Sequence, residues 1–391
     1  MRYILKKFAP FIFFPIIFIF RILQKKFNIR LGLLDFSRIG HAVSFSANYL
    51  IEKKLDTKKY IDIIFSSDDT ANFFIKKKIS KKISFFNSQF FFDLFNYCYK
   101  YWFKDLNYLI KFNINSLGKT FDLQDFLYFS EKEKNSVDKS LLELGITKKD
   151  KWICIHNRDD AYLNLVYPDK DWSYHDYRNF PINDLLKVCK KMISNGYTVI
   201  RVGNIVKNSL NISHPKFIDY HLLKNKSDLL ESYLLSNAHL YFGSDSGIFN
   251  ISMISKVPFS FINFPSITNM VKYYYWNPFP FIFKLRKNEN NEIISLSKQL
   301  ETNLDETFML EEFKKKKIQL INNTPDEIED LFNEIDLKDE FKEELINDTE
   351  NKYLEKKFWE IFDSCSKLND LPKKKPYIGK KFLKNHSYIL Q

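Results

Sequence analysis

Residues 239–264 read HLYFGSDSGIFNISMISKVPFSFINF, and this stretch decides the fold class. It begins with the apolar run His239–Phe242 and continues with the small and polar residues Gly243–Gly247. The next run, Ile248–Ser255, is apolar and long enough for a short helix, and a further strand follows at Phe259–Phe264. A strand, a loop, a helix and a strand in this order are typical of an α/β fold with a parallel sheet.

The same alternation extends upstream from this stretch. Hydrophobic periodicity predicts strands at Trp152–Ile155, Tyr197–Val202 and Phe217–Tyr220, and helices at Ile182–Asn195, closed by Gly196, and at Lys226–Ser236. Alternating strands and helices form an open, doubly wound sheet, and in such sheets ligands bind outside the carboxyl ends of the strands. The loops that follow the strands are therefore the places where we expect chemistry.

The N-terminal third predicts a second α/β region. Strands at Ile29–Leu33 and Tyr60–Phe65 flank a helix at Ala42–Lys53. A polar helix over residues 131–147 ends near Gly145 and marks a boundary. The expected organisation is an apolar segment at 1–27, a Rossmann-like domain at 28–145, a second Rossmann-like domain at 146–300, and a helical extension and tail at 301–391.

The composition limits the kinds of partner. The chain has 391 residues, a formal charge of +12 and 4 cysteines, which form no C-x-x-C pair. Such cysteines predict neither a zinc site nor a disulfide framework, so we expect reduced thiols in the cytoplasm. A basic surface suits anionic partners. The lysine runs lack the interleaved aromatic residues typical of nucleic-acid binding, and we predict no nucleic acid partner.

The segment 8–20, FAPFIFFPIIFIF, is apolar and has cationic flanks. It is shorter than the roughly 20 residues that span a bilayer, and Pro10 and Pro15 interrupt a straight helix. No small-residue cleavage site follows, which argues against a signal peptide. We expect this segment to lie in the interface at the inner face of the cytoplasmic membrane; a signal-anchor and a buried helix of the fold are the alternatives.

The loop after the strand 152–155 gathers several charged groups. It consists of His156, Asn157, Arg158, Asp159 and Asp160. An arginine can hold a phosphate through two parallel hydrogen bonds, and charged groups at a strand end cost solvation energy unless something there uses them. The alternative is a surface ion pair between Arg158 and one of the two aspartates.

A second cation follows the strand 197–202. Arg201 ends this strand and Gly203 comes directly after it. Two arginines from neighbouring strand ends suit a pyrophosphate better than one, and a glycine permits close approach of a ligand to the backbone. We therefore predict that both loops contribute to one anion site.

The strongest single signal is the loop after the strand 239–242. It consists of Gly243, Ser244, Asp245, Ser246 and Gly247. The backbone N–H groups at the start of the following helix suit an anion, and the side chains can hold ribose or phosphate oxygens. Helix N-capping is the alternative, but a cap requires one such residue. The sequence contains neither a P-loop nor a G-x-G-x-x-G motif.

In this order, the motifs resemble the donor-binding domain of GT-B glycosyltransferases. IHNRDD resembles the H-x-R-x-x-D loop of fucosyltransferase-like enzymes, with Asp160 one place early. The segment 239–265 resembles that of heptosyltransferases, with Asn250 where these carry a histidine. Together with YHDYRNFPINDLL and GYTVIRVGN, the motifs are similar to a family of bacterial surface-polysaccharide glycosyltransferases. For YHDYRN, residues 174–179, a flap over the donor and a structural insertion both remain open.

The same resemblance places acceptor-side residues after the first strand. His41 matches a position where GT-B enzymes carry a catalytic base, and Gly40 belongs to the turn before it. A histidine suits deprotonation of a hydroxyl near neutral pH. Asp35 and the acidic pair 68–69 are rival bases, and Arg38 can hold an acceptor phosphate or pair with Asp35. A capping or surface role is the alternative for His41.

These features predict a two-domain GT-B glycosyltransferase that is peripheral at the cytoplasmic face of the membrane. It would transfer a sugar from a nucleotide-sugar donor to a glycan or lipid-linked acceptor in surface polysaccharide biosynthesis. No cofactor is expected, and no metal, because the donor region contains no D-x-D triplet and cationic side chains can meet the leaving charge. The alternative is a catalytically silent relative that binds nucleotide-sugars or scaffolds a polysaccharide assembly complex.

Overall fold

The computed structural model describes residues 27–101, 110, 126–274, 276–335, 349–368 and 374–391, together with the single positions 15, 18, 19, 22 and 23. The chain divides into two compact units, Met1–Phe129 and Ser130–Gln391. Most of the apolar segment 8–20 lies outside the described residues, so its predicted place at a membrane stays a prediction. Among the helices that are described, none is long and apolar enough to cross a membrane.

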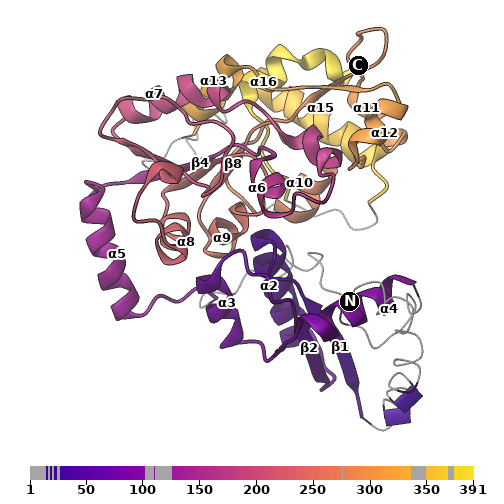
Figure 1. Ribbon diagram of the computed structural model, residues 1–391. Coiled ribbons are helices and arrows are strands. Elements are labelled where there is room, and N and C mark those ends of the chain that lie inside the picture. Colours follow the sequence, from indigo (N-terminus) through magenta and orange to yellow (C-terminus); the bar gives the residue numbers. More distant parts are fainter. Residues whose placement is uncertain are drawn as a thin grey trace. The chain divides into compact units, whose positions relative to one another are not determined.

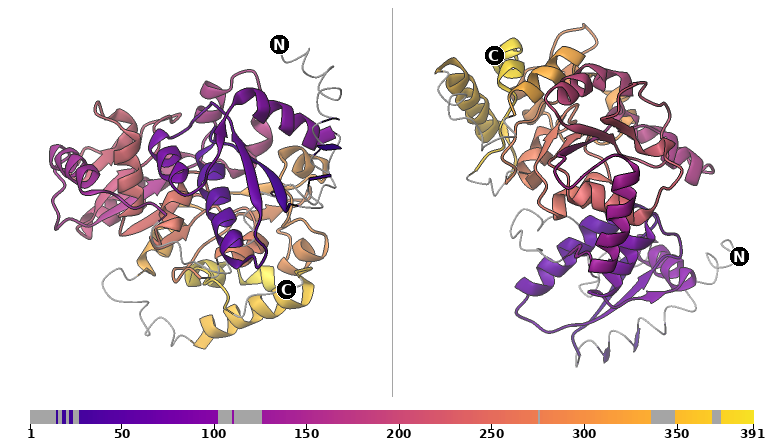
Figure 2. Two further views of the ribbon diagram at one scale, coloured as in Figure 1. Left: turned by 90° about the horizontal axis from the view of Figure 1, so that it is seen from below. Right: turned by 90° about the vertical axis from the view of Figure 1, so that its left-hand side faces the viewer.

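The first unit contains a parallel sheet with the strand order β1-β2-β3. Its strands are β1 (Ile29–Leu34), β2 (Ile61–Ser66) and β3 (Phe86–Asn87), and its helices are α2 (Ile39–Leu55), α3 (Phe73–Ser80) and α4 (Gln89–Tyr101), coloured indigo to purple in Figure 2. Ile29 pairs with Ile61 at the start of the ladder. Because the strands are parallel, their carboxyl ends meet at one edge of the sheet.

The second unit is built on a parallel sheet with the strand order β6-β5-β4-β7-β8. Its strands are β4 (Trp152–His156), β5 (Thr198–Arg201), β6 (Phe217–Asp219), β7 (Leu240–Gly243) and β8 (Phe259–Phe261). Nearly all of their side chains are buried, as in parallel sheets that are covered on both faces. The prediction of two α/β regions with parallel sheets is confirmed.

Helices cover both faces of this second sheet. Figure 1 shows α7 (Leu186–Ser194) and α13 (Pro325–Asn333) on one face, and α8 (Asp228–Ser236) and α9 (Phe249–Ile254) on the other. The polar helix α5 (Glu131–Glu143) contacts α8. The compact units thus divide before α5, between residues 129 and 130, whereas the expected domain boundary lies after it, at 145.

The C-terminal residues belong to the same compact unit as this sheet. They form α10 (Ile267–Tyr274), β9 (Leu285–Lys287), α11 (Leu296–Glu301), α12 (Leu310–Lys315), β10 (Gln319–Ile321), α15 (Thr349–Cys365), α16 (Lys380–Asn385) and the 3-10 turn η4 (Ser387–Leu390). α15 contacts α11 and α16, and α16 contacts α13. The described part of the predicted extension 301–391 therefore completes the second unit.

A long connection joins β4 to α7. It contains α6 (Ala161–Val166) and the 3-10 turns η1 (Ser173–Arg178) and η2 (Ile182–Leu185). A further 3-10 turn, η3 (Tyr220–Leu222), follows β6. We call residues 173–179, which comprise η1 and Asn179, the strap, because these residues are bonded across the carboxyl ends of the strands.

Candidate functional site

The carboxyl ends of β4 and β7 form the switch point of the second sheet. β4 lies between β5 and β7, so the chain leaves it on one side and later returns on the other. In open α/β sheets this is the place where ligands bind. His156 at the end of β4 pairs with Gly243 at the end of β7, and the Ser244 N–H donates to the His156 carbonyl oxygen at 2.9 Å. The loops predicted at 156–160 and 243–247 thus begin side by side.

Gly243 is required by the close approach of these two strands. A Cβ atom at this position would lie 2.0 Å from the carbonyl oxygen of His156. No heavy atom fits at that distance, so any other residue would push β7 away from β4. The glycine therefore sets the spacing of the two loops.

The strap is bonded to both loops. Arg158 donates from Nη1 to the His175 carbonyl oxygen at 3.2 Å and to Asn179 Oδ1. Arg178 donates to the carbonyl oxygen of Asp245 and forms an ion pair with its carboxylate at 3.4 Å. The sequence YHDYRN, for which a flap and an insertion are the alternatives, lies within the strap. These bonds hold it over the switch point.

Lys284 is a further cation at this place, and the sequence interpretation missed it. It lies in the segment between β8 and β9, and its residue is 2% exposed. Its Nζ donates to the carbonyl oxygens of Tyr177 at 2.8 Å and Asn179 at 3.0 Å. We call Arg158, Arg178 and Lys284 the cation cluster.

Positive charge in the cation cluster is only partly compensated. Burial, and then the charges of Arg158 and Arg178, lower the pKa of Lys284 to about 7, although Asp184 acts in the opposite direction. Burial, and then Arg178, lowers the pKa of Arg158 to about 10. Among the described residues, no carboxylate lies within ion-pair distance of Arg158 or Lys284, whereas Arg178 has Asp245. An anion bound here would relieve this repulsion.

Neutral donors also lie at the end of β7. The Ser244 hydroxyl is buried and has no hydrogen-bond partner within the described part of the chain. The backbone N–H groups of residues 245–248 likewise donate to no described acceptor. Buried polar groups normally find partners, so the Ser244 hydroxyl suits an oxygen atom of a ligand, and the partly exposed N–H groups beside it can donate to the same ligand.

His156 is held as a neutral imidazole. Its Nδ1 lies 3.1 Å from the Val202 carbonyl oxygen, and burial lowers its pKa to about 4. Because a carbonyl oxygen only accepts, Nδ1 must carry the proton and Nε2 is left as an acceptor. His156 therefore adds no charge to the site but can accept a hydrogen bond.

Arg201, predicted as a donor contact, has partners within the fold. Its side chain is 1% exposed and pairs with Asp219 at 3.3 Å. It also donates to the Asn208 carbonyl oxygen and to Asn157 Oδ1. These partners make Arg201 a structural cation that joins β5, β6 and the loop after β4.

Asp159 and Gly203 also serve the fold. Asp159 accepts from the backbone N–H groups of Ala161 at 3.1 Å and Lys207 at 2.9 Å, so it ties two loops together. Gly203 has a φ of 117°, a conformation that favours glycine. Its N–H donates to Glu231 at 3.2 Å.

Glu231 on α8 is a buried carboxyl that the sequence interpretation also missed. Burial raises its pKa to about 7, although the hydrogen bond from Gly203 acts in the opposite direction. The Gly203 backbone lies against the His156 ring. Gly203 therefore lies between the Glu231 carboxyl and the ring of the switch-point His156.

The acceptor-side candidates gather in the first unit, at the carboxyl end of β1. Asp35 accepts from the Ser37 N–H at 2.8 Å and from Ser67 Oγ at 3.4 Å. Gly40 and His41 lie in the first turn of α2, after Arg38. Burial, and then the charge of Arg38, lower the pKa of His41 from its ordinary value, although Asp35 acts in the opposite direction. His41 is therefore mostly neutral at pH 7 and can accept a proton.

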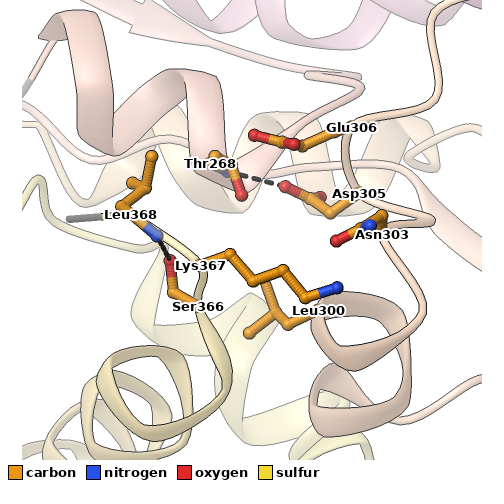
Figure 3. A pocket seen from close by; sticks show the side chains of 8 residues that line it. All are labelled: Thr268, Leu300, Asn303, Asp305, Glu306, Ser366, Lys367 and Leu368. Carbon is orange, nitrogen blue, oxygen red and sulfur yellow. Dashed lines mark hydrogen bonds between the residues drawn. The ribbon is translucent and has the colours of Figure 1, made fainter.

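A small pocket elsewhere in the second unit contains none of the predicted site residues. It is lined by Thr268, Leu300, Asn303, Asp305, Glu306, Ser366, Lys367 and Leu368. Figure 3 shows the carboxylates of Asp305 and Glu306 on one side and Lys367 on the other. Asp305 is already bonded to the Thr268 N–H at 2.7 Å and to Arg286 at 3.2 Å. Its carboxylate thus stabilises the fold.

Comparisons with known proteins give similarity in fold only. No protein-family model matches the sequence, and no curated protein matches it significantly. Solved glycosyltransferases are similar in structure. ADP-heptose LPS heptosyltransferase II of E. coli and a family 9 glycosyl transferase of Veillonella parvula both cover 61% of this chain, at 10% identity and a TM-score of 0.36. The matches cover 85% and 81% of those chains.

E. coli heptosyltransferase WaaC with ADP covers the same share of this chain at 9% identity, with a TM-score of 0.31 and 88% of its own length. A dodecameric glycosyltransferase of E. coli, TibC, is described as iron-containing. In the part of this chain that the structure describes, no cluster of His, Cys, Asp or Glu is arranged to hold a metal. Because identities are near 10% and TM-scores are below 0.5, no residue role is transferred from these proteins.

Proposed function

We propose that the protein is a GT-B glycosyltransferase whose second unit binds a nucleotide-sugar. The observation that carries the proposal is the cation cluster at the switch point, where the buried Arg158 and Lys284 have no carboxylate within ion-pair distance among the described residues. A diphosphate brings the negative charge that this cluster lacks. The Ser244 hydroxyl and the N–H groups of residues 245–248, which have no partner among the described residues, would hold its remaining oxygens.

The cluster would act on the departing diphosphate. As the bond between the anomeric carbon and the diphosphate oxygen breaks, negative charge grows on that oxygen. Cations that are already in place stabilise this charge more in the transition state than in the bound donor. Arg178 is tied to Asp245 and Arg158 to the strap, so donor binding would exchange some of these contacts for phosphate contacts.

The first unit would supply the base. His41 would take the proton of an acceptor hydroxyl, whose oxygen then forms the new bond to the anomeric carbon. The lowered pKa of His41 supports this role, because a neutral imidazole is the form that accepts a proton. The neighbouring Asp35 would stabilise the imidazolium that forms, or act as the base in place of His41.

We place the activity in surface polysaccharide biosynthesis at the cytoplasmic face of the membrane, with a glycan or lipid-linked acceptor and without a metal. The support is the motif resemblance and the apolar segment 8–20 with its cationic flanks. A catalytically silent nucleotide-sugar-binding protein remains the second candidate, because the cation cluster would serve binding equally well.

The test is release of nucleoside diphosphate from a panel of ADP-, GDP- and UDP-sugars, with a bacterial glycan extract as acceptor. We expect one donor to be consumed by the wild type. His41→Ala should lose turnover but still bind that donor, and the exposed His214→Ala should behave like the wild type. Donor binding without turnover in the wild type would favour the silent protein; no donor binding would contradict both candidates.

A further inference from the structure

The first unit carries an exposed group of aromatic rings at the carboxyl edge of its sheet. Phe86 on β3 is 63% exposed, and Phe90 and Phe91 on α4 are 45% and 39% exposed. We call these residues the aromatic platform. The rings are contiguous: Phe90 and Phe91 are 5.3 Å apart, and Phe65 on β2 lies 5.1 Å from Phe91 and 5.7 Å from Phe86. Single exposed apolar residues are ordinary, but a contiguous group indicates a binding surface.

Polar groups border the aromatic platform. Asp68 and Asp69 follow β2 and are exposed. Asn87, next to Phe86, donates to Asp68 Oδ1 at 3.2 Å. The Asp68 N–H donates to Gln89 Oε1 at 3.0 Å, and Gln89 is the neighbour of Phe90. A carboxylate and two amides thus lie beside the exposed rings.

A network of hydrogen bonds holds this edge in place. Lys76 on α3 donates to Asn87 Oδ1 at 2.8 Å, to Thr70 Oγ1 at 3.1 Å and to the Ser67 carbonyl oxygen at 3.2 Å. All three ammonium hydrogens are therefore used within the fold. Ser66 Oγ adds a hydrogen bond to Asn87 at 2.8 Å. The polar groups beside the rings are positioned before any ligand binds.

The charge at this edge selects among ligands. Anionic lipid or a phosphorylated sugar would meet the exposed carboxylates of Asp68 and Asp69, and the charge of the nearby Lys76 is offset by that of Asp68. A neutral sugar has an apolar C–H face, which packs on aromatic rings, and hydroxyl groups, which donate to carboxylate and amide oxygens. These requirements match the aromatic platform and its border.

We propose that the aromatic platform, with Asp68, binds a neutral sugar residue of the acceptor glycan. This inference rests on the proposed glycosyltransferase function, and it specifies the class of acceptor. Ser67 links the aromatic platform to the candidate base Asp35. Its hydroxyl donates to Asp35 at 3.4 Å, and the next residue along the chain is Asp68. A sugar on the platform lies at the sheet edge that carries Asp35 and His41.

The test is ligand-observed saturation-transfer NMR with the full chain and no donor. The probes are methyl glycosides of glucose, galactose, mannose and N-acetylglucosamine, with glucose 1-phosphate as the charged counterpart. We expect at least one neutral glycoside to bind and glucose 1-phosphate not to bind. Phe90→Ala should weaken that binding at least tenfold, and Asp68→Asn about fivefold. Phe308→Ala, which removes a ring 42% exposed in the second unit, should have no effect.

Several results would overturn the proposal that the aromatic platform binds a neutral sugar. They are binding of glucose 1-phosphate in preference to the neutral glycosides, binding that Phe90→Ala leaves unchanged, no binding of any probe, and Phe90-dependent cosedimentation with vesicles of anionic phospholipid. A thermal-shift titration with nucleotide-sugars, run on the same samples, separates this failure from that of the proposed function. If nucleotide-sugars bind and the glycosides do not, only the platform is wrong.

Discussion

Two buried arginines at neighbouring strand ends have opposite surroundings. Arg201 at the end of β5 has Asp219 as an ion-pair partner, and its side chain is 1% exposed. Arg158 at the end of β4 bonds to a carbonyl and an amide oxygen of the strap and lies near two further cations. The sequence predicted one role for both residues. A carboxylate partner thus makes Arg201 a structural cation, whereas Arg158, buried among neutral partners and further cations, favours an anion.

The largest effect expected from this comparison is on stability. Arg201→Met leaves Asp219 buried without its cation, and breaking a buried pair in this way costs about 3–5 kcal/mol. Urea denaturation should show this loss in the free energy of unfolding. A change below about 1 kcal/mol would mean that Arg201 is not the structural cation of this edge.

Arg158→Met should lower nucleotide-sugar affinity more than it lowers the free energy of unfolding. It removes hydrogen bonds to a charged ligand, worth about 1.5–3 kcal/mol, so nucleotide-sugar affinity should fall about 10- to 100-fold. The free energy of unfolding should fall by less than about 1.5 kcal/mol, because removing one cation also relieves repulsion on Lys284. Equal affinity for wild type and variant in calorimetry would remove Arg158 from the site.

The pH dependence of binding sharpens the comparison further. The pKa of Lys284 is about 7 in the free protein, and a bound diphosphate would raise it, so binding takes up a proton. Affinity for a nucleotide-sugar, whose diphosphate does not titrate in this range, should therefore be full at pH 6 and weaken about tenfold by pH 8.

Lys284→Met should flatten this profile, and the exposed Lys298→Met should not. Arg158, Arg178 and Asp184 face Lys284. Glu231, which is bonded to Gly203, also has a pKa of about 7. If Lys284→Met retained the full pH dependence, Glu231 rather than Lys284 would be the titrating group.

The smallest effect is expected at Ser244. Its hydroxyl has no partner among the described residues, so Ser244→Ala should leave stability nearly unchanged. Loss of one neutral hydrogen bond to the ligand should weaken nucleotide-sugar binding about two- to fivefold. A marked loss of stability instead would show that the hydroxyl serves the fold.

The sequence predicted the elements that have strong local patterns. The strands from residue 152 onward, the helix before Asn195 and the paired loops at 156–160 and 243–247 follow from hydrophobic periodicity and small residues. The ends differ by a few residues; for instance, the predicted strand Phe259–Phe264 is β8 at Phe259–Phe261. Residues 80–130 could not be ordered, because their aromatic composition has no clear period.

The partners of the cations could not be predicted from the sequence. Lys284 bonds to the strap across more than 100 residues, and Arg201 finds Asp219 through sheet pairing. No local pattern separates a cation that meets a carboxylate from one that does not. A lysine within an apolar run, as in Phe281–Leu285, is the signal that could have indicated burial of Lys284.

The central claim is that the cation cluster binds the diphosphate of a nucleotide-sugar. Its most direct test is isothermal titration calorimetry of the full chain with ADP, GDP and UDP and their sugars, on the wild type, Arg158→Met and Lys284→Met. We expect one nucleotide to bind the wild type at pH 6.5 and to bind each variant at least tenfold more weakly. No binding by the folded wild type, or binding that neither variant changes, would contradict it.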